Sequence, residues 1–265
     1  MKNYFLLGLV VLLFLAARIY KITEIPQSLY WDEASIGYNA YAVATDLKDE
    51  WGEFLPLHFR AFGEFKLPVY VYSVAILTKI FGLGPLAVRL PAVFYGLGVI
   101  IVTYLLVVKI TQDRKIGLMS AFVLSVSPWL FIFTRAGFEA IAGLFFFELF
   151  IFFLIFYLEK RVFIIPASFA AILAFYSYNS FRILTPIFVL VFIAYLILNR
   201  KIKFDNKIYL EIIALAFFIL SLFPTIKLFY LDNGAARFAT VGVSNPRLLI
   251  SNYFSHFNFN FLFSE

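Results

Sequence analysis

Long apolar runs separated by short polar segments dominate the pattern along the chain. Several of these runs are long enough to cross the roughly 30 Å hydrocarbon layer of a bilayer as helices. They lack the strict alternation of apolar and polar residues that a transmembrane strand shows. The pattern therefore predicts an all-α integral membrane protein with about seven spans. The expected spans are residues 4–20, 90–108, 116–133, 140–158, 162–179, 183–198 and 208–229.

The segment 67–82 decides the topology, because it is apolar but short, begins near Pro68 and carries Lys79. If this segment crossed the membrane, three basic clusters of the chain would lie outside. The positive-inside rule places such clusters in the cytoplasm. We therefore predict that 67–82 lies in the outer interface and that the C-terminus is outside. The basic clusters are Lys109/Arg114/Lys115, Lys160/Arg161 and Arg200/Lys201/Lys203/Lys207.

The segment 21–66 follows the first apolar run and forms an acidic outer loop in this topology. It contains eight of the 16 acidic residues of the chain. These eight are Glu24, Asp32, Glu33, Asp46, Asp49, Glu50, Glu53 and Glu64. Apolar residues recur at helical spacing from Ile36 to Leu47, which predicts an amphipathic helix over 33–47 lying on the membrane surface. Asp32 would stand at its N-terminus.

Composition supports the membrane class and excludes several functions. The chain has 63% hydrophobic and 14% charged residues, and a mean hydropathy of +0.92, which is more apolar surface than a soluble core buries. The net charge of +6 is scattered between the apolar runs, so it indicates membrane topology and no nucleic-acid partner. The absence of cysteine and the isolated His58 and His256 argue against a metal centre built on these residue types. No Walker loop or dinucleotide fingerprint is present, so a lipid-linked donor fits better than a nucleotide-linked one.

The acidic pair Asp32-Glu33 and the later Lys66 are the first candidates for chemistry. The pair could simply cap a helix and offset its dipole. Alternatively one carboxylate is a general base, and the other orients it or holds a cation. Lys66 either reaches toward lipid headgroups or supplies a positive charge for a lipid-linked phosphate.

Arg135 and Glu139 stand four residues apart and could form an ordinary ion pair at a helix end. In the functional interpretation, Arg135 binds a phosphate and Glu139 places the sugar or the acceptor. Arg89 and Arg182 are weaker candidates for the same basic rim. Glu148 lies within an apolar run on the opposite helix face from Glu139, so we expect it to be hydrogen-bonded between helices.

Four motifs in a fixed order resemble the GT-C glycosyltransferases. They are Trp31-Asp32-Glu33, Phe65-Lys66-Leu67-Pro68-Val69-Tyr70, the run from Gly84 to Ala92, and Ser127-Pro128 followed by Arg135 and Glu139. Within that fold the chain is similar to glycosyltransferase family 39. This family includes bacterial dolichyl-phosphate-mannose protein mannosyltransferases and the aminoarabinose transferases of lipid A. The resemblance covers about residues 1–200.

The resemblance implies an inverting transfer of one sugar from a polyprenyl-phosphate carrier to a hydroxyl or phosphate acceptor. The acceptor would be a protein, a lipid or a cell-surface glycan on the outer face of the plasma membrane. Asp32 would be the catalytic base beside Glu33, and Lys66 and Arg135 would contact the donor phosphate. Glu139, with Arg89 and Arg182, would contact the substrates.

The chain departs from the family pattern in two places. Lys66 is followed by Leu-Pro where Pro-Pro is expected, and Glu139 stands four residues after Arg135 where some members have five. The second departure leaves the role of Glu139 open. No cofactor is implied apart from the lipid-linked donor, although a divalent cation remains an option.

Two other interpretations remain. A transporter or flippase would use Glu148 for coupling and the acidic pair as a gate, but the related halves expected of such proteins are not visible. The second interpretation is a truncated, inactive member of the family. It is suggested because residues 1–265 form one predicted transmembrane module that ends without a clear final helix.

Overall fold

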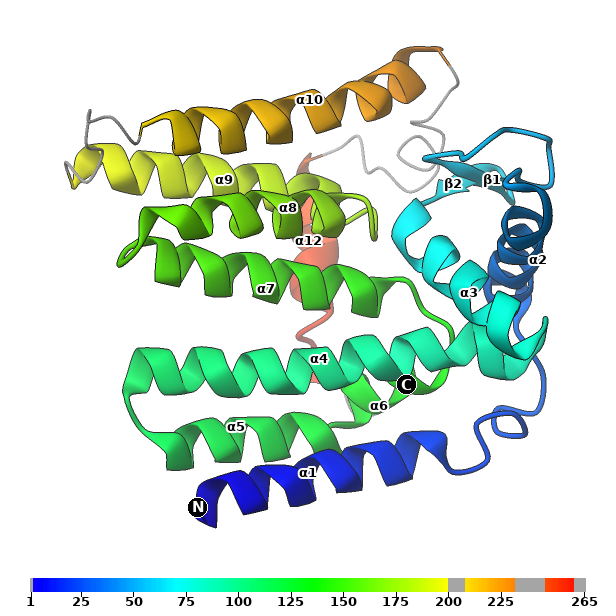
Figure 1. Cartoon of the computed structure of the whole chain (residues 1–265), viewed down its shortest axis with the longest axis horizontal. Coiled ribbons are helices and arrows are strands. Elements are labelled where there is room, and N and C mark those ends of the chain that lie inside the picture. Colours follow the sequence, from blue (N-terminus) through cyan, green and yellow to red (C-terminus); the bar gives the residue numbers. More distant parts are fainter. Residues whose placement is uncertain (1, 200–207, 232–245, 260–265) are drawn as a thin grey trace. The chain divides into compact units, whose positions relative to one another are not determined.

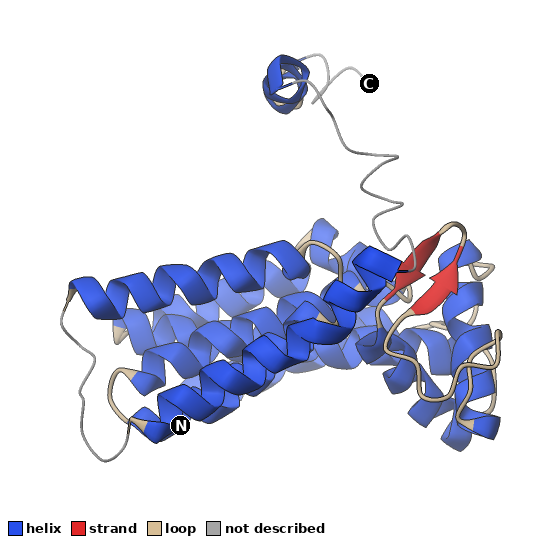
Figure 2. Cartoon of the chain, turned by 90° about the horizontal axis from the view of Figure 1, so that it is seen from above, coloured by secondary structure: helices blue, strands red, loops and turns tan. Residues whose placement is uncertain are grey.

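The computed structural model describes residues 2–199, 208–231 and 246–259, and nearly all of its regular structure is helical (Figures 1 and 2). The prediction of an all-α membrane fold is confirmed. The helices are α1 (Lys2–Ile19), α2 (Trp31–Asp46), α3 (Pro68–Phe81), α4 (Pro85–Thr111), α5 (Arg114–Val126), α6 (Pro128–Arg135), α7 (Ala140–Tyr157), the 3-10 turn η1 (Arg161–Phe163), α8 (Ile164–Phe175), α9 (Phe181–Leu198), α10 (Tyr209–Leu231) and α12 (Pro246–Ser255). Two short strands, β1 (Phe59–Ala61) and β2 (Glu64–Lys66), form a two-stranded sheet.

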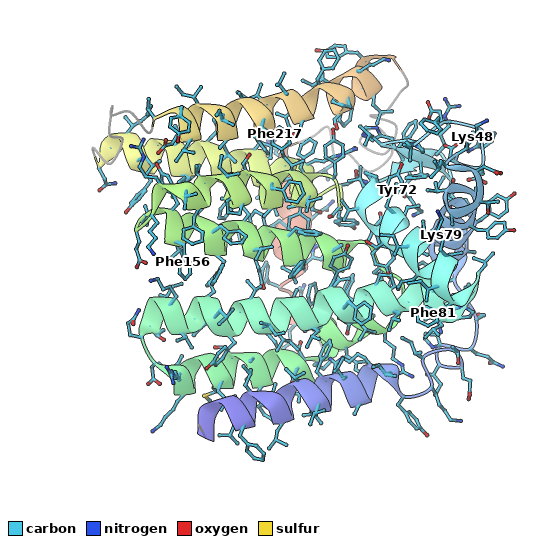
Figure 3. The ribbon with its side chains drawn as sticks, in the orientation of Figure 1. Lys48, Tyr72, Lys79, Phe81, Phe156 and Phe217 are labelled. Atoms are coloured by element: carbon cyan, nitrogen blue, oxygen red, sulfur yellow. The ribbon has the colours of Figure 1, made fainter. Side chains whose placement is uncertain are left out.

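The chain divides into two compact units, residues 1–59 with 66–223 and residues 60–65 with 224–265. The first unit holds every candidate site residue. In it, α4, α5, α7, α8 and α9 lie side by side, and α2 and α3 stand at one end of these helices (Figure 1). Within this first unit, Figure 3 labels Phe156 among the long helices, and Lys48 and Lys79 at the end with α2 and α3. The second unit contains α12 and the last residues of α10.

The long helices of the structure agree with the predicted spans in position, but their number differs. By length and composition, α4, α7, α9 and α10 are able to cross a membrane, and α5 with α6 would make a fifth span if the bent pair counts as one. The apolar helices Phe5–Ile19 and Arg161–Phe175 are shorter. The count of seven therefore stays a prediction.

The span expected over 116–133 corresponds to two helices, α5 and α6, and the chain bends by 60° between them. Proline has no backbone N–H, and it disfavours helical geometry in the residue before it. Ser127 accordingly adopts extended angles of φ −61° and ψ 125°, and α6 starts again at Pro128. The sequence motif Ser127-Pro128 is thus a helix break.

The helix predicted over 33–47 forms as α2, and most of its apolar face is buried within the protein. Ile36, Ala40 and Val43 are buried in the main hydrophobic core, where α2 packs against α3 and α4. Protein therefore covers the part of the predicted apolar stripe from Ile36 to Val43, whereas Leu47 is exposed. The segment 67–82 is also helical, as α3, and its residues Tyr70 and Val74 belong to the same core.

Close helix packing in the bundle depends on small residues and aromatic rings. A Cβ added to Gly143 on α7 would stand 2.3 Å from the ring of Phe181 on α9, so only glycine allows this approach. Phe147 on α7 packs against the rings of Phe181 and Phe188, at centroid distances of 5.3 and 4.9 Å. Glu148 accepts hydrogen bonds from Thr103 on α4 at 3.2 and 3.1 Å. This confirms the expected hydrogen bonding of Glu148 between helices.

Candidate active site

Asp32 is the second residue of α2, and it is the more accessible member of the acidic pair. Its side chain is 28% exposed, and its Oδ1 accepts a hydrogen bond of 2.5 Å from Nζ of Lys66, which is only 4% exposed. Lys66 is the last residue of β2, directly before α3. Because Pro68 opens α3, Leu67 takes extended angles, and the chain turns from strand to helix immediately after the lysine. Residues 34 positions apart thus form one ion pair.

Tyr30 lies beside this ion pair, and sequence reasoning did not single it out. It precedes the first residue of α2 in extended conformation, and the charge of Asp32 acts on its hydroxyl group. Burial, and then the negative charge of Asp32, raise the pKa of Tyr30 above its ordinary value, so the hydroxyl stays protonated. The ring packs at 5.2 Å from that of Phe138 in the loop before α7. The only signal in the sequence was its place next to the acidic pair.

Glu33 has an environment quite different from that of Asp32, because it is 1% exposed and faces the fully buried Arg89 of α4. Oε1 accepts from Nε of Arg89 at 2.9 Å and from the backbone N–H of Gly137 at 2.8 Å. Oε2 accepts from Nη2 of Arg89 at 3.3 Å and from the backbone N–H of Tyr30 at 3.2 Å. Glu33 therefore ties the start of α2 to α4 and to the loop before α7.

Arg89 was expected on a basic rim facing the substrates, but all N–H groups of its guanidinium group donate hydrogen bonds within the protein. Besides its two bonds to Glu33, it donates from Nη1 to the carbonyls of Ile22 and Pro26 at 2.8 and 2.9 Å. Nη2 also donates to the carbonyl of Ser28 at 3.0 Å. An arginine has five N–H donors, and these five bonds engage all of them. Arg89 orders the segment 22–28 and leaves no donor for a phosphate.

Arg135 was expected to bind the donor phosphate, yet its terminal nitrogens cap the C-terminus of α1. Nη1 donates to the carbonyls of Ala17 and Arg18 at 2.9 and 3.2 Å. Nη2 donates to the carbonyls of Tyr20 and Lys21 at 2.6 and 3.4 Å. A positive charge at this position offsets the negative end of the helix dipole and satisfies carbonyls that have no partner within the helix. The sequence offered no sign of this contact, because it joins residues 118 positions apart.

Glu139 and Arg182 interact electrostatically, and their expected contact with the substrates stays a prediction. Glu139 immediately precedes α7, and its charge acts on Tyr30 and on Arg182, the second residue of α9. Nη1 of Arg182 also donates to Asn179 at 3.4 Å. Arg182 acts in turn on His58, which is 8% exposed. Burial and then the positive charge of Arg182 lower the pKa of His58 to about 3. The histidine is therefore neutral at physiological pH.

The model of a family described as dolichyl-phosphate-mannose-protein mannosyltransferase matches residues 66–223, more than half of the chain. The chain belongs to this mannosyltransferase family. Comparisons with curated proteins and with solved structures found no match. The protein is therefore a multi-pass membrane glycosyltransferase of the GT-C type.

The match to the mannosyltransferase family begins at Lys66 and contains Arg89, Arg135, Glu139 and Arg182. The acidic pair lies before it, so the pairing of Asp32 with Lys66 joins the preceding segment to the matched region. The two carboxylates of the pair face different cations, Lys66 and Arg89. Among the residues that the structure describes, no group of three or more His, Cys, Asp or Glu side chains is placed to hold a metal ion.

Proposed function

We propose that this mannosyltransferase-family protein transfers one sugar from a polyprenyl-phosphate carrier to an acceptor hydroxyl or phosphate group, with inversion, on the extracytoplasmic face of the plasma membrane. Asp32 is the general base. The observation that carries this proposal is the contact between the partly exposed Asp32 carboxylate and the buried ammonium of Lys66. A carboxylate can accept the proton of an acceptor hydroxyl, and an ammonium group can stabilise the charge of a leaving phosphate. Asp32 and Lys66 place these two groups next to each other.

In the proposed reaction, the carboxylate of Asp32 takes the proton of the acceptor hydroxyl as the acceptor oxygen bonds to the anomeric carbon. The bond from that carbon to the phosphate oxygen breaks at the same time, and its electron pair leaves with the polyprenyl phosphate. Attack from the face opposite the phosphate inverts the anomeric configuration. Lys66 holds the carboxylate in place through its hydrogen bond.

The leaving phosphate gains negative charge in the transition state, so it needs positive charge nearby more than it needs an acid. Lys66 supplies a point charge, and its side chain is only 4% exposed, so its electrostatic interactions are stronger than they would be in water. Arg182, held near Glu139, is the second candidate for this role. Arg135 and Arg89 act by positioning instead, since their guanidinium groups hold α1 and the acidic pair.

Substitution of the base tests the proposal most directly. Asp32→Asn keeps the shape of the side chain but removes its ability to take a proton, so we expect the rate of sugar transfer to fall at least a hundredfold. Asp46→Asn is the matched control, because Asp46 is an exposed residue at the other end of the same helix. Release of polyprenyl phosphate from radiolabelled polyprenyl-phosphate mannose in proteoliposomes measures the reaction. Full activity of Asp32→Asn would eliminate this residue as the base.

A second measurement separates the donor site from the base. Lys66→Ala should raise the apparent KM for the lipid-linked donor, because it removes the charge beside the phosphate. Lys48→Ala, which removes an exposed lysine from the same segment, should leave it unchanged. An unaltered donor KM in Lys66→Ala would contradict a phosphate contact. Movement of the intact lipid-linked sugar across the bilayer without cleavage would favour a flippase.

A further inference from the structure

A cavity of about 330 Å³ lies between α7, α8, α9 and α10. Its wall is almost entirely apolar and includes Phe150, Leu154, Ala167, Ala171, Phe192 and Phe218. Protein interiors are close-packed, so a space of this size calls for an occupant. Water does not fill an apolar space, because it needs several polar partners there. Among membrane-spanning helices, the apolar molecule at hand is the hydrocarbon chain of a lipid.

Hydrogen bonds from side chains set the distance between α10 and its neighbours. Ser168 on α8 donates to the carbonyl of Ala214 at 2.8 Å, and both residues line the cavity. Figure 1 shows α10 alongside α9 and α8. The lining residues Ile212 and Leu215 of α10 are exposed, so the cavity opens on a surface of the helices that faces lipid. A hydrocarbon chain can therefore enter it from the bilayer.

One end of the cavity carries a carboxylate whose two oxygens differ. Glu211 lies in the first turn of α10 and lines the cavity. Its Oε1 accepts from the hydroxyl of Tyr157 at 2.9 Å and from Nε of Arg161 at 2.6 Å. Its Oε2 is buried and accepts no hydrogen bond within the part of the chain that the structure describes. A buried acceptor without a donor is costly, so a ligand that brings an N–H or O–H group to this end is favoured.

This polar end is remote from the candidate active site. Tyr157 is the last residue of α7, whereas Glu139 immediately precedes the same helix. Eighteen residues of helix separate the two, which is about 27 Å along the helix axis. The adjoining Lys160 and Arg161 form one of the basic clusters predicted to be cytoplasmic. A lipid bound here belongs to the inner leaflet, so it is a different molecule from the sugar donor on the outer face.

We propose that this cavity binds one acyl chain of an inner-leaflet phospholipid whose headgroup carries a primary ammonium, as in phosphatidylethanolamine. The chain fills the apolar space, and the ammonium donates to Oε2 of Glu211. The exposed Lys160 offers a positive charge for the lipid phosphate. Hydrogen bonds between opposite charges are about twice as strong as neutral ones, which favours an ammonium over a hydroxyl group. A choline headgroup has no N–H to donate, and a fatty acid would bring a second negative charge.

Binding of defined lipids tests the proposal without sugar transfer. Native mass spectrometry of the full chain in detergent measures the retention of added phosphatidylethanolamine, phosphatidylcholine and phosphatidylglycerol with identical acyl chains. We expect one phosphatidylethanolamine per chain, bound about tenfold more tightly than either other lipid. Glu211→Gln removes the charge and should abolish most of this preference, while leaving the binding of phosphatidylcholine unchanged. Glu159→Gln is the matched control, because Glu159 is an exposed carboxylate outside the cavity that pairs with Lys109, and it should keep the full preference.

A second variant tests the apolar part of the site. Ala171 lines the cavity and is 1% exposed, so Ala171→Leu places a larger side chain in the space that the acyl chain would occupy. This variant should weaken the binding of all three lipids. Helical circular dichroism equal to that of the parent shows that each variant is folded.

Several outcomes would overturn the inference. Equal retention of phosphatidylethanolamine and phosphatidylcholine by the parent protein needs no variant and would remove the ammonium contact. Preference for phosphatidylglycerol would assign a hydroxyl donor and refute the proposed headgroup. An equal loss in Glu159→Gln and Glu211→Gln would reduce the effect to general surface charge. Unchanged binding in Ala171→Leu would place the lipid outside the cavity.

Discussion

The buried ion pair between Glu33 and Arg89 offers the sharpest test of how the candidate site is held. In Arg89→Met, the carboxylate of Glu33 stays buried at 1% exposure and loses two of its four hydrogen-bond donors. The carbonyls of Ile22, Pro26 and Ser28 lose their donor as well. We expect this single substitution to destabilise the protein strongly.

The magnitude follows from the burial of both partners. Breaking a buried ion pair by removing one member costs about 3–5 kcal/mol, because the remaining charge has no counterion. Replacing both members by apolar residues of similar volume is often close to neutral. Here Glu33→Leu also leaves the backbone N–H groups of Gly137 and Tyr30 without their acceptor, at about 1–3 kcal/mol each. The unpaired N–H groups affect Glu33→Leu and the double variant alike, so the double variant Glu33→Leu/Arg89→Met should be less destabilised than the sum of the two single variants by about 3 kcal/mol or more.

The assay is unfolding of the detergent-solubilised protein, followed by the loss of helical circular dichroism in denaturant. Arg114→Ala serves as the control, because it removes an exposed arginine at the start of α5 and should change stability by less than about 0.5 kcal/mol. If the effects of the two single substitutions simply add in the double variant, the reasoning from the buried pair is refuted.

Other predictions concern the surroundings of the site. Gly137→Ala should destabilise the protein by about 1–3 kcal/mol, because a Cβ there would meet a side-chain atom of Val88 at 2.9 Å; unfolding under the same conditions measures the loss. The pKa of His58 is about 3 in the folded protein and about 6.5 when unfolded, so its contribution to stability is complete above pH 6.5 and is lost as the pH falls toward 3. Melting temperatures recorded between pH 7.5 and 4.5 should accordingly fall more steeply for the parent protein than for His58→Gln, and equal slopes would contradict this. Arg135→Gln should increase proteolysis after α1, because it removes the charge that caps this helix; an unchanged cleavage pattern would argue against the cap. A reporter fused after Lys115 should be cytoplasmic, and an external signal would reverse the predicted topology.

Much of the fold could be predicted from local patterns. The predicted spans at 140–158 and 183–198 agree with α7 and α9 within two residues at each end, because a continuous apolar run in a membrane has to satisfy its backbone hydrogen bonds internally. Proline positions carried local information as well, since Pro68 and Pro85 open α3 and α4. The same rule explains the break at Pro128, which the apolar pattern alone concealed.

The candidate site could be predicted only in part. The structure brings the two predicted site residues Asp32 and Lys66 into contact, and the catalytic roles expected of them stay predictions. The roles expected of Arg89 and Arg135 do not fit their contacts. The periodicity of a sequence does not indicate which groups a charged side chain contacts in the folded protein. A buried arginine and a substrate-binding arginine look alike in a sequence, and only their partners distinguish them.

The sequence by itself determined that this protein is helical and embedded in a membrane, and that its acidic residues concentrate in one segment. These properties follow from hydropathy and from the backbone's need for hydrogen bonds, which act over neighbouring residues. The tertiary structure alone decided that Glu33 is buried on Arg89 while Asp32 stays accessible beside Lys66. It also turned the apolar face of α2 toward α3 and left the aromatic face exposed. Such choices depend on contacts between residues 34 to 118 positions apart, where burial and charge pairing are set by the whole fold.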